Sequence, residues 1–214
     1  KAGTQTCSDD GSAWGPCTGD VTPQPEDCAT PADEDCGGGA CAGLVWAKRL
    51  GSAPLTQDGN AVAMNAAGEI ALGGDFEGGL DLGGGPLSGT AGGFVAKLGP
   101  AGEHIWSRSL GITDYSGTYP VQSVAFDAAG DVLLGGQAVG VVDVGGGPRC
   151  VDGPYDQGIF AKLDAQGNHI WSRCVGGPGS SISNVRLAAG PAGEVIVVGG
   201  FGGEVDFGTG PLTS

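Results

Sequence analysis

The chain has 214 residues, with 24 acidic and 9 basic side chains and a net charge of −15. So acidic a surface repels phosphate backbones, which argues against nucleic-acid binding. No apolar run approaches the ~18 residues of a membrane-spanning helix. Glycine and proline make up about 28% of the residues, near the composition of disordered chains. Because hydrophobic residues reach 40% and the glycines recur beside apolar runs, we still expect a folded protein.

Residues 1–43 are predicted to form a separate module held by cross-links. Five of the seven cysteines lie in this stretch, which has few large apolar side chains. Dense cysteine without a core is typical of a disulfide-stapled module in an oxidising compartment, and zinc is the alternative. The stretch has neither a CxxC motif nor a nearby histidine, which argues against zinc. Proximity suggests the pairs Cys7–Cys17 and Cys28–Cys36, which leaves Cys41 without a partner in this chain.

The acidic residues of this module allow two interpretations. They form a solvated, solubilising surface, or they bind a divalent cation through clustered carboxylate oxygens. Asp33, Glu34 and Asp35 are the candidate ligands, and calcium is the candidate cofactor. Because the chain begins at Lys1 with no apolar leader, we read it as a processed or excised piece.

Residues 44–214 contain one segment that occurs three times. AGEIALGGDFEGGLDLGGGPLSG (67–89) returns as AGDVLLGGQAVGVVDVGGGPRC (129–150) and as AGEVIVVGGFGGEVDFGTGPLT (192–213). FVAKLGPAGEHIWSRSLG (94–111) likewise returns as FAKLDAQGNHIWSRCVG (160–176), and LVWAKRLG (44–51) is the tail of an earlier copy. A fixed period of about 62 residues indicates a repeat architecture.

The repeat predicts an all-β fold. Its apolar runs are 4–7 residues long, are separated by glycine-rich turns and show no helical period. Four short antiparallel strands per repeat suit a β-propeller blade, and a parallel β-solenoid is the alternative. The expected pieces are a partial blade at 44–59, units at about 60–122 and 123–184, and an incomplete unit at 185–214. Since a propeller needs ~4–8 blades, we expect a fragment or a protomer that completes its ring in trans.

Most candidate functional residues fall at equivalent places in successive repeats, so we predict that they are structural. We expect ion pairs beside the strands and hydrogen bonds from aspartate to turn backbone, rather than catalysis. The positions are His104 and His169; Lys97 and Lys162; Lys48, Arg108 and Arg173; and Asp81, Asp143 and Asp206.

Two features differ between repeats. The loops 112–120 and 149–157 carry Tyr115, Tyr119 and Tyr155, which are candidate recognition residues or simple loop filler. Cys150 and Cys174 stand where the preceding unit has Ser88 and Ser109. Because both positions become cysteine in the same repeat, we predict a disulfide, worth about 3 kcal/mol by chain entropy.

The segments WAKRLG (46–51), VAMNAAGEIALGGDFEGGLDLGGGPLSG (62–89) and GGFVAKLGPAGEHIWSRSLG (92–111) resemble the SBBP-type bacterial β-propeller repeat. GTQTCSDDGSAWGPCTGDVTPQPEDCATPADEDCGG (3–38) resembles a Cys-rich metal-binding-motif module that often precedes such propellers in secreted proteins of myxobacteria. In that module Asp-Glu-Asp-Cys usually continues with Asp-Gly. Here Gly37 follows Cys36, so one expected carboxylate is missing.

The resemblance implies a large secreted or surface protein without assigned enzymatic activity. We therefore expect a non-enzymatic extracellular scaffold or binding protein, with a protein or cell-surface partner or further copies of itself. One alternative is a subunit of an extracellular filament, in which open blade edges pair between copies. The other is a propeller polysaccharide hydrolase or lyase with its site in blades outside this chain.

Overall fold

The computed structural model describes residues 46–51, 55–89, 91–114, 121–150 and 156–214. The chain divides into two units, Lys1–Lys48 and Arg49–Ser214. The predicted module at 1–43 lies outside the described residues, so the fold below is that of the second unit alone.

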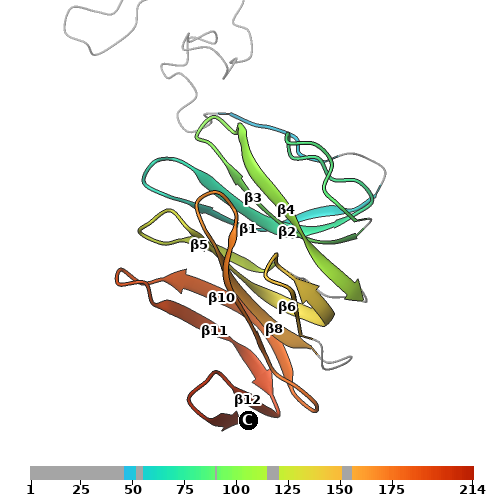
Figure 1. Cartoon of the computed structure of the whole chain (residues 1–214), viewed down its shortest axis with the longest axis vertical. Coiled ribbons are helices and arrows are strands. Elements are labelled where there is room, and N and C mark those ends of the chain that lie inside the picture. The colour runs from blue at the N-terminus through green and yellow to red at the C-terminus, as the bar shows by residue number, and fades with distance from the viewer. Residues whose placement is uncertain (1–45, 52–54, 90, 115–120, 151–155) are drawn as a thin grey trace, which may run out of the picture. The chain divides into compact units, whose positions relative to one another are not determined.

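The second unit is all-β, which confirms that part of the prediction, and its described residues form no helix (Figure 1). No described segment is therefore a helix with the length and apolarity of a membrane span. The strands are β1 (Gln57–Met64), β2 (Ile70–Glu77), β3 (Ala91–Leu98), β4 (His104–Asp114), β5 (Ser123–Phe126), β6 (Val132–Asp143), β7 (Pro148–Arg149), β8 (Gln157–Leu163), β9 (His169–Val175), β10 (Ser181–Ala189), β11 (Val195–Gly202), β12 (Glu204–Asp206) and β13 (Pro211–Thr213).

The sequence repeat appears in the structure as two successive antiparallel meanders. β1, β2, β3 and β4 pair in order, and β5, β6, β8 and β9 do the same one repeat later. β10 and β11 start a third repeat, and β10 begins at Ser181, inside the unit expected to end at 184. The turns that join the first two strands close at Gly68, Gly130 and Gly193. Each of these glycines has a positive φ and donates its N–H to the carbonyl three residues earlier.

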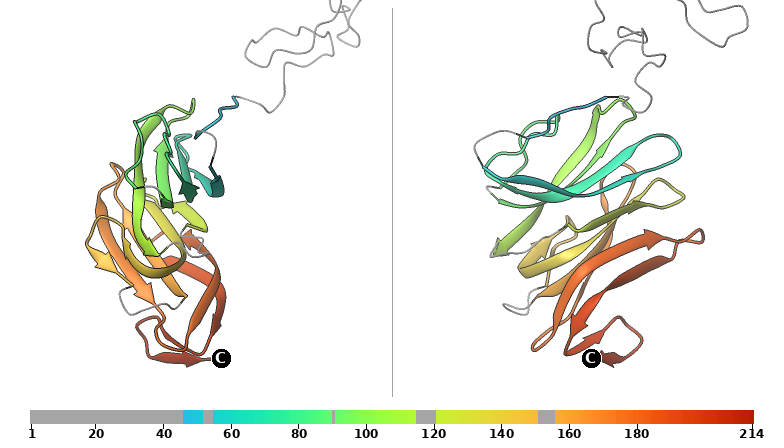
Figure 2. Two further views of the ribbon diagram at one scale, coloured as in Figure 1. Left: turned by 90° about the vertical axis from the view of Figure 1, so that its right-hand side faces the viewer. Right: turned by 180° about the vertical axis from the view of Figure 1, so that it is seen from behind.

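The two meanders are joined by backbone pairing, which the sequence did not predict. β4 continues past Leu110, and its end pairs with the end of β6, from Gly111 opposite Asp143 to Asp114 opposite Val139. The result is one curled antiparallel sheet of nine strands (Figure 2). β4, with 11 residues, is long enough to reach the next meander.

A short hairpin follows the second strand of each repeat. In the first repeat it is closed by a single bridge between Asp81 and Pro86. Its counterparts are the pairing of β6 with β7 and that of β12 with β13. The hairpins cover part of the sheet face with apolar side chains such as Leu80, Leu82 and Val205.

Each repeat packs face to face on the next. We call the side of a repeat that points to the following repeat its forward face, and the opposite side its rear face. The largest buried cluster joins the forward face of the first meander to the rear face of the second. It contains Ala71, Val95, Trp106 and Leu110 on one side, and Val124, Val132, Leu134, Ile159, Ala161 and Leu163 on the other.

Glycines in the second strand allow this close approach. A Cβ at Gly73 would lie within contact distance of Val121 and 2.9 Å from Val124 Cγ1. One repeat later, a Cβ at Gly135 would lie 2.7 Å from Leu187 Cδ2. The first strand of each following repeat therefore packs directly on backbone. In the third repeat, the position equivalent to Gly73 and Gly135 is Val198, and its side chain is 62% exposed.

Candidate functional site

The two histidines support loops. His104 Nε2 and Ser107 Oγ lie 3.0 Å apart in a hydrogen bond, and His169 Nε2 and Ser172 Oγ repeat the contact at 3.0 Å. Each ring also lies against a glycine of the neighbouring hairpin, Gly84 or Gly146, and leaves no room there for a Cβ. The same contacts in two repeats agree with the structural role predicted for both residues.

The aspartates of the hairpins bind backbone, as predicted. Asp81 Oδ1 accepts hydrogen bonds from the N–H groups of Gly83 and Gly85, at 2.7 and 3.0 Å. Asp143 and Asp206 each accept from the glycines two and four residues later in the same way. These carboxylates stabilise the tight glycine turns by accepting hydrogen bonds from backbone N–H groups close to them in the sequence.

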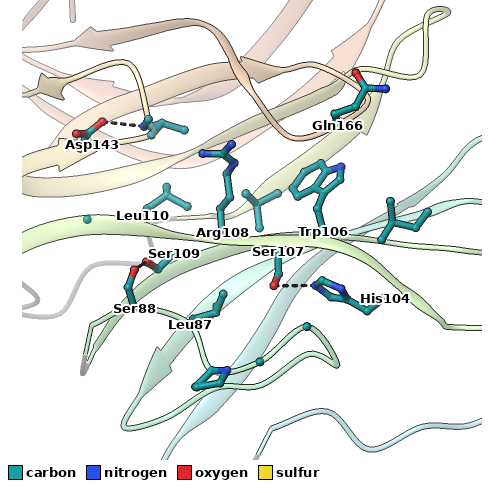
Figure 3. Close-up of a pocket in the computed structure, with 18 residues that line it drawn as sticks. Leu87, Ser88, His104, Trp106, Ser107, Arg108, Ser109, Leu110, Asp143 and Gln166 are labelled. Atoms are coloured by element: carbon teal, nitrogen blue, oxygen red, sulfur yellow. Dashed lines mark hydrogen bonds between the residues drawn. The ribbon is translucent and has the colours of Figure 1, made fainter.

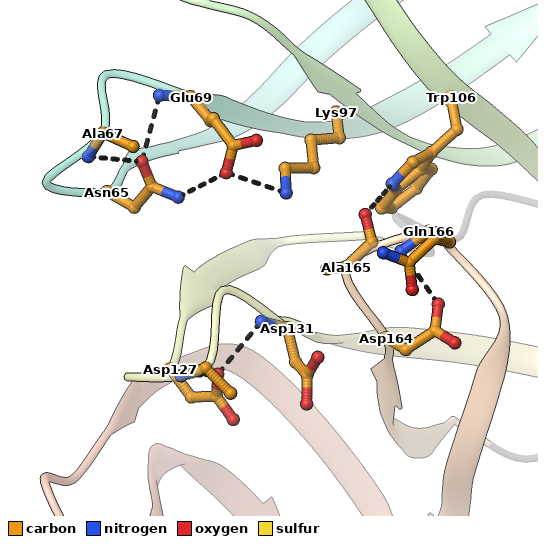
Figure 4. Close-up of polar contacts among 11 residues, drawn as sticks. Asn65, Ala67, Glu69, Lys97, Trp106, Asp127, Asp131, Asp164, Ala165 and Gln166 are labelled. Atoms are coloured by element: carbon orange, nitrogen blue, oxygen red, sulfur yellow. Dashed lines mark hydrogen bonds and ion pairs between the residues drawn. The ribbon is translucent and has the colours of Figure 1, made fainter.

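Lys97 is 3% exposed and pairs with a carboxylate of its own repeat (Figure 4). Its Nζ lies 2.8 Å from Glu69 Oε2 and 5.6 Å from the ring centroid of Phe126 in the next repeat. Hydrogen bonds from Lys97 and from Asn65 hold the pKa of Glu69 below its usual value. This ion pair lies where two repeats meet, so it contributes to their docking.

Lys162, the counterpart of Lys97, pairs with two carboxylates. Its Nζ lies 2.7 Å from Asp127 Oδ2 and 3.0 Å from Asp131 Oδ2. The hydrogen bonds to Asp127 and then to Asp131 raise the pKa of Lys162. Burial by itself would raise the pKa of Asp127, but hydrogen bonds from Lys162 and from backbone N–H groups hold it below its usual value.

Trp106 and Arg108 contact the following repeat. Trp106 Nε1 donates a 3.0 Å hydrogen bond to the carbonyl of Ala165, in the turn between β8 and β9 (Figure 4). Arg108 Nη2 lies 3.4 Å from Asn168 Oδ1, next to the same turn. One repeat later, Arg173 Nη1 donates to the carbonyl of Phe207 at 3.3 Å. These contacts span 34 to 60 residues.

The structure contains the disulfide between Cys150 and Cys174, with a Cα–Cα distance of 5.3 Å. At the equivalent place in the first meander, Ser88 Oγ and Ser109 Oγ lie 2.9 Å apart in a hydrogen bond. The same two positions are therefore joined in both repeats, covalently in one and by a hydrogen bond in the other.

The other predicted site residues lie outside the described part of the chain. They are the metal candidates Asp33, Glu34 and Asp35, the cysteines Cys7, Cys17, Cys28, Cys36 and Cys41, and the loop residues Tyr115, Tyr119 and Tyr155. Among the residues that are described, no group of three or more His, Cys, Asp or Glu side chains could hold a metal ion. Calcium binding stays a prediction.

Two surface cavities were not predicted from the sequence. One, of about 660 Å³, follows β4 between the first hairpin and Asp143 (Figure 3). Several of its polar side chains already have protein partners, for example Ser88 with Ser109, and His104 with Ser107. The other, of about 810 Å³, lies between β9 and β11 and is lined mainly by apolar side chains, including Phe160, Trp171 and Val197. We call it the β9–β11 groove.

Comparisons of the chain with protein-family models and with curated proteins find no match. The resemblance to the SBBP repeat and to the metal-binding-motif module therefore stays a prediction. The functional argument depends on the surfaces and contacts described above.

Proposed function

We propose that the chain is a secreted, non-enzymatic scaffold or binding protein, built from blades of a β-propeller, that associates with further copies of itself. The repeated meanders support the propeller, since they are four-stranded, antiparallel and packed face to face. β5 lies in contact with both β1 and β10, so the first strands of successive repeats are neighbours, as strands near a propeller axis would be.

The observation that carries the proposal is a pair of exposed apolar faces at the two ends of the stack of repeats. On the rear face of β1, Val62 is 70% and Met64 is 68% exposed. On the forward face of β11, Ile196 is 58% and Val198 is 62% exposed. Inside the stack, forward and rear faces cover each other, so the two end faces suit contact between copies. Such a head-to-tail contact closes a ring or extends a filament.

The repeated polar residues support a role without catalysis. The histidines, the hairpin aspartates and the buried lysine have structural partners that recur from one repeat to the next. The described residues therefore give the hydrolase or lyase alternative no support. Secretion is supported by the Cys150–Cys174 disulfide, because such bonds persist in oxidising compartments.

Sedimentation velocity over a wide concentration range tests the proposal. We expect reversible association that Met64→Lys and Ile196→Lys each weaken, because a charge would be buried in the contact. Ile170→Lys is the matched control, since Ile170 is 46% exposed but lies on neither end face. A chain that stays monomeric throughout would refute self-association.

A further inference from the structure

The cavity of about 660 Å³ between the first hairpin and Asp143 follows the edge of β4. Each residue from His104 to Gly111 lines it (Figure 3). Since successive side chains of a strand point to opposite faces of the sheet, a cavity that touches all of them runs along the edge of the strand. Its walls are the first hairpin at 84–88 and the glycine turn at 143–145. We call this cavity the β4 groove.

The backbone of β4 has an open edge in this groove. β4 lies between β3 and β6 in the sheet, and β3 pairs with it from His104 to Leu110. On the other edge, β6 pairs with β4 from Gly111 to Asp114. Among the described residues, no strand pairs with the rest of that edge. Its N–H and C=O groups are therefore a template for one more strand.

A glycine turn leaves this edge open. β6 runs antiparallel to β4 and reaches Asp143, which lies opposite Gly111. There Asp143 Oδ1 accepts the N–H groups of Gly145 and Gly147, at 2.7 and 3.1 Å, and the chain turns into the second hairpin. A strand added in the groove would continue the line that β6 leaves. All residues that line the groove belong to the first two repeats.

The side chains of the groove indicate what the added strand carries. Ile105 is 43% exposed, so an apolar residue opposite it would bury apolar surface. Arg108 is half-buried, and its hydrogen bond to Asn168 Oδ1 is long, at 3.4 Å. Because a guanidinium group has five N–H donors, Arg108 can also bind a ligand. An acidic residue opposite Arg108 would form a favourable cross-strand pair.

We propose that the β4 groove binds an extended peptide segment of a partner protein, which adds to β4 as a strand. The segment runs antiparallel to β4, with an acidic residue opposite Arg108 and an apolar residue opposite Ile105. A peptide is the ligand class because another backbone matches the alternating N–H and C=O groups of a strand edge. The inference goes beyond the proposed self-association, since the groove lies on neither end face.

The test uses the full chain and a labelled heptapeptide, Val-Thr-Glu-Thr-Val-Ile-Thr. In the antiparallel register its first residue lies opposite Leu110, its glutamate opposite Arg108 and its isoleucine opposite Ile105. We expect saturable binding by fluorescence anisotropy. Replacing the glutamate by lysine should weaken binding about fivefold, because the cross-strand pair becomes repulsive.

A charge reversal in the chain tests the register. Arg108→Glu should reverse the preference, so that the lysine peptide binds more tightly than the glutamate peptide. Arg173→Glu is the matched control, because Arg173 has the same place one repeat later and does not line the groove. No saturable binding, or equal binding of the two peptides to the unchanged chain, would overturn the peptide site.

Hydrogen exchange supplies a second readout. Binding should slow exchange of the backbone amides of β4 between His104 and Leu110 and leave those of β9 unchanged. Protection of β9 in place of β4 would overturn the site. Protection of β4 that rises with chain concentration without peptide would also overturn it, in favour of a second copy as the occupant. A chain that stays monomeric but binds the peptide would refute the proposed self-association alone.

Discussion

Gly73→Ala should destabilise the protein, although alanine is normally the better residue in a strand. A Cβ at Gly73 would meet Val121, which is 0% exposed, and would lie 2.9 Å from Val124 Cγ1. Ordinary carbon contacts are about 3.5–4.0 Å. Both valines are β-branched and stiff, so they cannot rotate away, and the first two repeats must move apart.

We estimate the cost as follows. Overpacking of a core destabilises a protein by about 1–3 kcal/mol. Replacing glycine by alanine also lowers the conformational entropy of the unfolded chain, which stabilises the folded protein by about 0.4–1 kcal/mol. The free energy of unfolding should therefore fall by about 1–2 kcal/mol, which lowers the Tm by about 2–8 °C for a domain of this size. Urea denaturation of the oxidised chain, followed by circular dichroism, measures this change.

Gly59→Ala provides the control, because a Cβ there would meet nothing within 4 Å, and we expect it to be neutral or slightly stabilising. Val121→Ala in the Gly73→Ala background should recover part of the loss, so the two changes should couple by about 1 kcal/mol. A Gly73→Ala chain as stable as the unchanged protein, or strictly additive effects, would refute the packing argument.

Three further predictions follow from the contacts. Replacing Cys150 and Cys174 by serine together should cost about 3 kcal/mol in urea denaturation, and an unchanged midpoint would contradict this. The raised pKa of Lys162 means that its ion pairs stabilise the fold fully below the usual lysine value of 10.5, and that this stability is lost as pH rises through the raised value. Lys162→Met should remove that alkaline loss and about 1 kcal/mol at neutral pH; an identical alkaline profile would count against the pairs. Trp106→Phe should cost about 1 kcal/mol through its lost hydrogen bond, whereas Trp171→Phe should cost clearly less; equal costs would be inconsistent with the contact to Ala165.

The local part of this fold could be predicted from the sequence. The turn glycines, the strands on either side of them and the aspartate-capped hairpins depend on residues within about five positions of one another. Their repetition made each one recognisable. The Cys150–Cys174 pair was found by comparing equivalent positions, because both depart from serine in the same repeat.

The long-range part could not be predicted. The pairing of β4 with β6 begins at Gly111 and runs into a segment that has no counterpart in the other repeats, so the repeat gave no signal for it. The contacts of Trp106 and Arg108 join side chains to a turn about 60 residues away. The equivalent positions predicted a structural role for Arg108 but not its partner. The β9–β11 groove is lined by residues from two different repeats, so no single stretch of sequence indicated it.

The extension of β4 gives the repeats an order of unfolding. The first two repeats share backbone hydrogen bonds as well as a buried face, because β4 crosses to β6. β9 ends at Val175, and β10 and β11 form a sheet of their own, so no strand pairing joins the second and third repeats in the described structure. They are held by side-chain packing and by isolated hydrogen bonds, such as the one that the Ile182 N–H donates to the Asp156 carbonyl. In a linear array each boundary contributes its own coupling energy. Under load or in denaturant, the third repeat should detach first, while the first two melt as a single cooperative block.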